Sequence, residues 1–207
     1  MRPWALLLLL GCAAPVGPRS QSEVVPAYRQ RVMGSGELLV GPPSLTRFEI
    51  DSTLAESFAT LYVDELPRYL RVGSRFDLVR FARAEKEVPL VPTPLPLDGQ
   101  EHRFWLPPPG GGIDYDWGLG PYWLLVQRIK LEPQLNQLHL TVEYVWWDNK
   151  ERALIGYGRL QLTGRADLAT LAQADRAQKD AEVRAFLNGM AAELIRHSPF
   201  FPVPRQG

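Results

Sequence analysis

The sequence predicts an α/β (α+β) fold in which two main helices pack on one mostly antiparallel sheet of about four to five strands, as a two-layer sandwich. Apolar residues recur at helical spacing near residues 54–70 and again at 183–195. Two long stretches of alternating character, 138–147 and 153–163, are separated by a polar turn. A chain of 207 residues that is 45% hydrophobic and 22% charged has the size and composition of one globular domain.

The first strands and the first helix follow each other closely. Leu38–Val40 is an apolar strand ended by glycine and two prolines, and Arg47–Ile50 alternates as a strand does. Asp51 or Ser52 is placed to cap a helix whose apolar residues, from Leu54 onward, share one face. We expect Pro67 to bend or restart this helix, because proline lacks a backbone donor. Phe76–Phe81 then reads as the next strand.

Residues 86–121 are rich in proline and glycine, which excludes a helix and predicts a long loop. A loop of this length in a compact domain is usually functional or mobile. Its aromatic side chains either fold back over the sheet or form an exposed binding face, and they are Phe104, Trp105, Tyr115 and Trp117.

The second half of the chain carries the clearest pattern. Tyr122–Leu131 begins apolar on both faces and ends alternating, which is typical of a central strand that runs to the rim of a sheet. The following hairpin places Trp146 and Trp147 on opposite faces, so one is expected in the core and the other under a helix or in a contact surface. A final helix carries an apolar stripe from Val183 to Ile195 and ends before Pro199.

The amino terminus has the parts of a secretory signal peptide over residues 1–11. An arginine precedes the short apolar stretch Trp4–Leu10, which is far below the about 20 residues that a transmembrane helix needs. Leu9-Leu10-Gly11-Cys12 resembles the bacterial lipobox, and this resemblance implies lipid on Cys12 and cleavage before it. Ala13 after the cysteine, where an aspartate can signal inner-membrane retention, then implies sorting to the outer membrane.

Three further segments complete the predicted organisation. Residues 12–35 contain prolines, glycines and serines and are expected to be a flexible tether with a reach of roughly 25 Å. Residues 36–200 form the single folded domain, and residues 201–207 form a tail. The tether would allow the domain to meet a partner at some distance from the bilayer.

Composition excludes several classes of function. The 23 basic and 23 acidic residues balance, which disfavours a nucleic-acid partner. A single cysteine permits no internal disulfide and no cysteine-based zinc cluster.

A search for catalytic and cofactor motifs finds no nucleophile elbow, phosphate-binding loop or His-Glu-x-x-His pair. The histidines are scattered, at positions 102, 139 and 197. Asp114 and Asp116 are adjacent loop acids of the kind that are usually solvated, although such a pair can act as acid and base or hold Ca²⁺. We therefore expect no catalytic residues, no metal and no cofactor.

The order of elements is similar to that of small two-layer domains in envelope lipoproteins. Gly118–Ile129 resembles the entry to the central strand of CsgG-like, TolB N-terminal-like and LpoB-like domains, and Leu140–Leu162 resembles their next hairpin. The last helix is similar to the end of auxiliary lipoproteins of ABC-type lipid transport systems. The chain departs from these families in having the proline- and glycine-rich segment where they often have a helix.

The sequence leaves two functions in competition. The first is a non-enzymatic adaptor or accessory subunit of an envelope complex for transport, secretion or cell-wall assembly. It would be anchored through Cys12, face the periplasm and bind an envelope protein through a sheet edge or through aromatics, which are Trp105, Tyr115, Trp117 and Trp147. The second is a small-ligand binder or hydrolase whose site the 86–121 segment builds from Asp114, Asp116 or His102 with Trp105 and Trp117.

Overall fold

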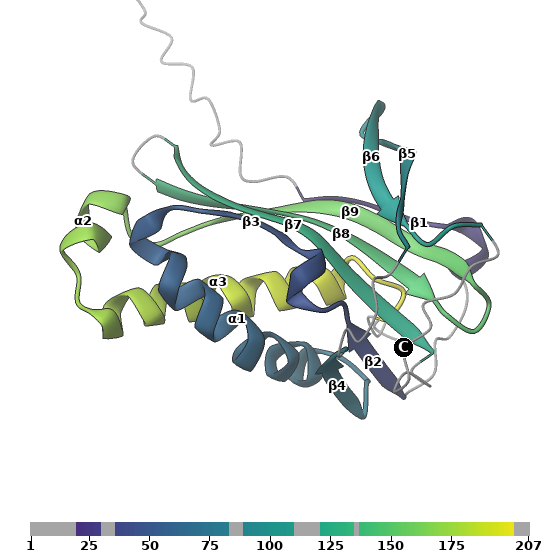
Figure 1. The fold of residues 1–207 in the computed structure, drawn as a ribbon, viewed down its shortest axis with the longest axis horizontal. Coiled ribbons are helices and arrows are strands. Elements are labelled where there is room, and N and C mark those ends of the chain that lie inside the picture. Colours follow the sequence, from purple (N-terminus) through teal and green to yellow (C-terminus); the bar gives the residue numbers. More distant parts are fainter. Residues whose placement is uncertain (1–19, 30–35, 83–88, 110–120, 135–136, 201–207) are drawn as a thin grey trace, which may run out of the picture.

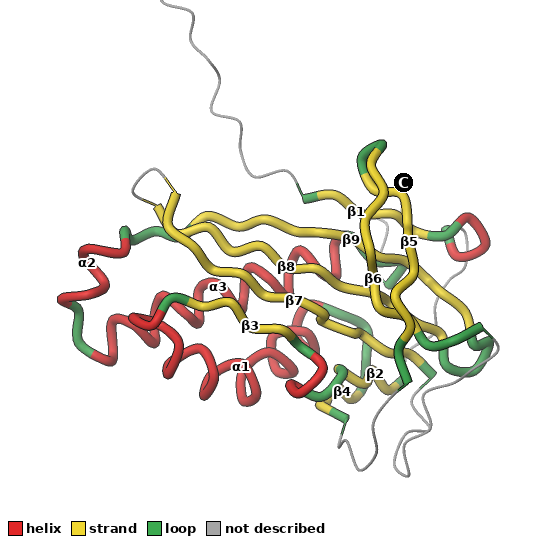
Figure 2. The backbone as a smooth tube through the Cα atoms, turned by 45° about the horizontal axis from the view of Figure 1, so that its top comes forward, coloured by secondary structure: helices red, strands yellow, loops and turns green. Residues whose placement is uncertain are grey.

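The computed structural model is a two-layer α+β domain with a small hairpin standing on its sheet (Figure 1). It describes residues 20–29, 36–82, 89–109, 121–134 and 137–200. The α+β class is confirmed, and two long helices cover one face of the sheet (Figure 2). The expected sheet of four to five strands is too small, because the main sheet has seven strands and a separate sheet has two.

The seven strands of the main sheet are β1 (Gln21–Val24), β2 (Glu37–Val40), β3 (Arg47–Ile50), β4 (Leu78–Phe81), β7 (Tyr122–Gln134), β8 (Gln137–Asp148) and β9 (Ala153–Thr163). The strand order is β1-β9-β8-β7-β2-β4, and β3 also pairs with β7. β7, β8, β9 and β1 are antiparallel neighbours, whereas β2 and β3 run parallel to β7 and β4 runs parallel to β2. The sheet is therefore mixed, and β7 is central as predicted.

The helices are α1 (Ser52–Gly73), α2 (Leu168–Gln173) and α3 (Arg176–Arg196). Asp51 caps α1, because its carboxylate accepts a hydrogen bond from the Thr53 N–H at 2.9 Å. α1 continues through Pro67 instead of restarting there. Leu66 and Leu70 are fully buried and hold the helix on the core, so packing outweighs the hydrogen bond that proline removes. No helix in the described part of the chain is long and apolar enough to cross a membrane.

The main core lies between the sheet and the two long helices. Alternate residues of β7, β8 and β9 point toward α1 and α3, and Trp146 is fully buried among them. Trp147 belongs to a second apolar cluster on the opposite face of the sheet. The prediction that the two indoles lie on opposite faces is confirmed.

Two regions expected to lack regular structure contain strands. Within the predicted tether 12–35, Gln21–Val24 forms β1 and pairs with β9. Within the predicted loop 86–121, β5 (Val91–Leu97) and β6 (Gln100–Leu106) form an antiparallel hairpin. β1 is too short to give a local signal, and the prolines of β5 hide its strand character from sequence patterns.

Candidate functional site

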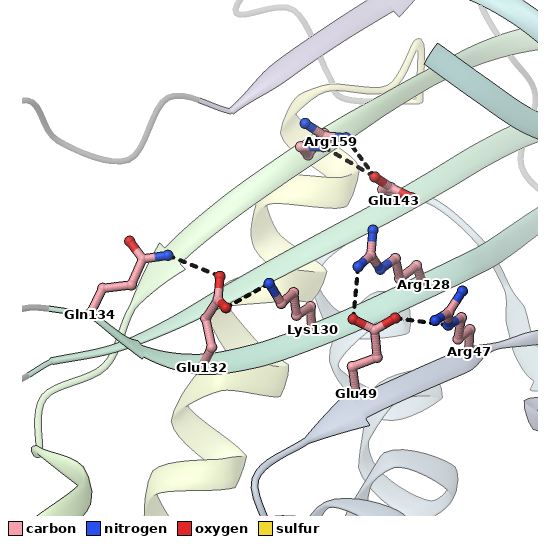
Figure 3. A network of polar contacts seen from close by, with 8 residues as sticks. All are labelled: Arg47, Glu49, Arg128, Lys130, Glu132, Gln134, Glu143 and Arg159. Atoms are coloured by element: carbon pink, nitrogen blue, oxygen red, sulfur yellow. Dashed lines mark hydrogen bonds and ion pairs between the residues drawn. The ribbon is translucent and has the colours of Figure 1, made fainter.

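The sheet face opposite the helices is divided into a covered half and an open half. The hairpin covers one half with Leu97, Phe104 and Leu106, which are all buried. They pack on side chains of the main sheet, which are Leu39, Trp123, Leu125, Val145, Trp147 and Tyr157. The other half has no such cover among the described residues (Figure 2). It carries charged side chains (Figure 3). The candidate site is this open half, called the open face below, together with the hairpin beside it.

The hairpin is built by a tight turn and fastened to the sheet on both sides. Asp98 and Gly99 have φ values of 53° and 71°, so both turn residues are left-handed, as a type I′ turn requires. On the β5 side, the Tyr157 hydroxyl donates to the Pro96 carbonyl oxygen at 2.6 Å. Gln21 Nε2 donates to Asp98 Oδ2 at 2.6 Å. β1 and β9 thereby position β5.

Gln127 fastens the β6 side of the hairpin. The register of β7 against β8 shifts between Val126 and Arg128, which marks a β-bulge at Gln127. Gln127 Oε1 accepts from the Trp105 N–H at 2.9 Å, and Gln127 Nε2 donates to the Trp105 carbonyl oxygen. The glutamine amide therefore pairs with β6 as the backbone of a neighbouring strand would. Because of the bulge, the consecutive side chains of Gln127 and Arg128 both lie on this face of the sheet.

Glu49 is the centre of one charged group on the open face (Figure 3). Its two carboxylate oxygens lie 2.7 Å from Arg47 Nε and 2.7 Å from Arg128 Nη2. The hydrogen bond from Arg128 is the main reason that the pKa of Glu49 is lowered. The same bond raises the pKa of Arg128. These ion pairs hold Arg128 in place beside the hairpin.

Two further ion pairs extend the open face along β7 to β9 (Figure 3). Lys130 Nζ lies 2.6 Å from Glu132 Oε2, and hydrogen bonding to Lys130 is the main cause of a lowered pKa of Glu132. Arg159 Nη2 lies 2.7 Å from Glu143 Oε1 and 3.3 Å from His102 Nδ1 of the hairpin. His102 of the hairpin thus faces an arginine of the main sheet.

A pocket of about 450 Å³ lies between β6 and the open face. Its walls combine an exposed tryptophan, leucines and charged side chains, namely Ser44, Leu45, Arg47, Leu90, Arg103, Trp105, Leu125, Val126, Gln127, Arg128 and Glu143. Including the ion-pair partners Glu49 and Arg159, four arginines here face two glutamates. The pocket is therefore positively charged and partly apolar.

The residues predicted to contact a partner or ligand differ in their exposure. Trp105 is 48% exposed and lines the pocket. Trp147 is 4% exposed, because the chain's own hairpin covers that face, so its ring is not available to a partner. Cys12, Tyr115 and Trp117 lie outside the described residues.

The acidic residues and histidines considered as candidate site residues do not form one cluster among the described residues. Asp114 and Asp116 lie outside the described residues, and His102 binds Arg159. His139 lies near Thr163 on the open face, and His197 contacts Glu193 on the helix side. Among the described residues, no three His, Cys, Asp or Glu side chains gather as metal ligands would.

Sequence reasoning missed Gln127 and the arginines around it. One signal was present, because the strand pattern changes from apolar on both faces to alternating at Gln127. The contribution of Arg47 and Arg103 had no such signal, since each comes from a different segment that only the fold brings to the pocket.

No protein-family model matches the chain, and none of the curated proteins compared with it matches. A comparison with solved structures finds similar chains. A PelC dodecamer from Paraburkholderia phytofirmans is 12% identical, with 89% of this chain and 97% of that chain covered and a TM-score of 0.46. Hypothetical protein CT253 from Chlamydia trachomatis is 11% identical, with 78% and 96% covered and a TM-score of 0.48. Neither is described as a CsgG-like, TolB or LpoB domain, so that resemblance stays a prediction, and identities this low transfer no function.

Proposed function

We propose that this chain is a lipid-anchored periplasmic protein that acts as a non-enzymatic adaptor or accessory subunit of an envelope complex. The observation that carries the proposal is Trp105, a half-exposed tryptophan on a hairpin that is hydrogen-bonded to the main sheet. Tryptophan and arginine are the side chains most enriched at the energetic centres of protein interfaces. An aromatic anchor held in a fixed position costs little entropy when a partner binds.

The open face beside Trp105 supports the same function. Its charges are already paired with each other, as in Glu49 with Arg128 and Glu143 with Arg159, so their positions are fixed before a partner arrives. Such a surface sets specificity and orientation more than affinity. A partner that covers Trp105 would meet these ion pairs at its rim.

The proposed anchor is lipid on Cys12, with the domain held at the outer membrane and facing the periplasm. Stable anchoring by acyl chains requires at least two of them, at about 0.8 kcal/mol per buried methylene. Mass spectrometry of the amino-terminal peptide should show an acylated Cys12. A soluble, unmodified protein would exclude the anchor.

Site-specific photocrosslinking in the native host tests the adaptor. A photoreactive amino acid is placed at Trp105, and a matched control places it at Val72, which is 87% exposed on α1 in the helix layer. We expect a discrete, stoichiometric adduct with an envelope protein from position 105 and none from position 72. No adduct at 105, or the same adducts from both positions, would contradict the proposal.

The pocket favours a second candidate, a small-ligand-binding protein. Its volume of about 450 Å³ lies within the usual range for ligand sites. A hydrolase built on Asp114 and Asp116 would need residues outside the described part of the chain. A small molecule that co-purifies with the wild type and is lost in Trp105→Ala, without any protein adduct at position 105, would favour this candidate.

A further inference from the structure

The two edges of the hairpin are unequal, because every second residue of β5 is a proline. Pro92, Pro94 and Pro96 pair with Trp105, Arg103 and Glu101 of β6. In an antiparallel pair, opposite residues either exchange both backbone hydrogen bonds or both point their N–H and C=O groups outward. Proline has no N–H, so it is tolerated only at the outward-pointing positions.

Two contacts of the hairpin fix this assignment independently. The Trp105 N–H and C=O bind Gln127, which lies outside the hairpin, so residue 105 points outward from β6. The Pro96 carbonyl accepts from Tyr157, so residue 96 points outward from β5. Since outward positions alternate along a strand, Glu101 and Arg103 also direct their backbone groups away from β5.

The result is a hairpin with one blocked edge and one open edge. The three prolines remove the donors along the outer edge of β5, which prevents a further strand from pairing there. Both Glu101 and Arg103 are exposed, and β6 pairs with no strand other than β5 among the described residues. Their outward N–H and C=O groups are the groups that an added strand would use.

Positive charge lies directly beside this open edge. Arg103 and Trp105 of β6 line the same pocket as Arg47 and Arg128. Together with the ion-pair partners Glu49 and Arg159, four arginines and two glutamates lie at this pocket. Arg103 forms no ion pair with a described residue, whereas Arg47 and Arg128 share Glu49. An acidic side chain beside Arg103 would gain a charge-assisted hydrogen bond without breaking an existing pair.

We propose that the outer edge of β6 binds an extended acidic segment of a partner protein by strand addition, with a carboxylate of that segment in the arginine pocket. This inference rests on the proposed adaptor function and specifies the kind of partner. Backbone pairing at Glu101 and Arg103 supplies affinity, and the arginines and Trp105 select the side chains. The blocked edge of β5 ensures that the segment adds on one side only.

Binding is measured by fluorescence anisotropy with the full chain in detergent and a labelled decapeptide of alternating valine and glutamate. Two control peptides are used, one with lysine for glutamate and one with proline for valine, and free glutamate is added as a competitor. We expect binding of the acidic peptide alone, weakened as salt rises. Equal binding of the proline peptide, or full displacement by millimolar free glutamate, would show a simple anion site and overturn the proposal.

A matched pair of variants separates the backbone bond from the charge. Arg103→Gln removes the charge and keeps the N–H, whereas Arg103→Pro removes both at a position whose partner, Pro94, is already a proline. We expect Arg103→Gln to weaken peptide binding by roughly fivefold at low salt. Arg103→Pro should weaken it by about threefold to tenfold more, the effect of one net hydrogen bond. Equal affinities of the two variants would contradict strand addition.

A second pair of variants keeps the test valid if Arg103→Pro disturbs the hairpin. Glu101→Pro and Glu101→Gln differ in the same outward N–H near the tip, and the proline variant should bind about threefold to tenfold more weakly. Arg75→Glu, an exposed arginine outside the site, controls for net charge and should bind as the wild type does. Self-association of the wild type that Arg103→Pro abolishes would assign the edge to a second copy and overturn the proposal.

The outcomes also separate this inference from the function on which it rests. A protein adduct at position 105 together with no peptide binding would retain the adaptor and reject the acidic strand. No adduct at position 105 would reject the adaptor itself.

Discussion

Gln127→Leu tests how the hairpin is held to the sheet. Leucine keeps the approximate size of glutamine but removes both amide hydrogen bonds to the Trp105 backbone. Each bond contributes about 0.5–1.5 kcal/mol net. Because Trp105 is half exposed and water can replace part of the loss, we expect the free energy of unfolding to fall by about 1–2 kcal/mol.

The effect of Gln127→Leu should be local to β6. The buried residues Phe104 and Leu106 still hold the hairpin to the sheet, but the Trp105 amide loses its acceptor. Amide hydrogen exchange by NMR should show faster exchange at residue 105 in the variant. Gln161→Leu changes a glutamine of β9 and is the matched control. Unchanged exchange at 105, or the same increase in the control, would refute the role of Gln127.

Three more predictions concern the parts that build the site. Phe104→Ala should lower the free energy of unfolding in urea by about 3–5 kcal/mol, because it empties the core under the hairpin, and an unchanged value would refute that packing. Glu49→Gln should reduce the acid sensitivity of stability: the Glu49 pKa is lowered mainly by Arg128, so its contribution is complete above the ordinary pKa of about 4.5 and is lost as the pH falls through the lowered value. The difference in stability between wild type and Glu49→Gln, measured by urea titration, should thus shrink toward low pH. Gly158→Ala should displace β1, since its methyl group would stand 2.5 Å from a carbonyl oxygen of β1, and should cost about 1–3 kcal/mol, whereas Gly73→Ala meets no atom within 4 Å and should cost nothing.

Patterns within single segments were sufficient for most of the main sheet and the long helices. β8 and β9 were predicted because alternation over many residues has one physical cause, a strand with two different faces. The cap at Asp51 and the apolar stripe of α3 are likewise local features.

The missed elements depend on distant partners. β1 has four residues, and its place in the sheet comes from β9, more than 130 positions later in the chain. β5 contains three prolines, and it becomes a strand because their missing donors all point away from β6. A short stretch of sequence cannot show either feature, because each depends on which strand lies beside the segment in the folded sheet.

The sequence by itself determined the α+β class, the central position of β7 and the opposite faces of Trp146 and Trp147. The lipid anchor at Cys12 stays a prediction, because Cys12 lies outside the described residues. The tertiary structure alone decided which indole is accessible: Trp147 lies under the hairpin, and Trp105 lies beside the open face. It also decided where Arg47, Arg103 and Arg128 meet. The physical reason is that alternation fixes the face on which a side chain lies, whereas cover and charge at a site depend on segments that chain folding brings together.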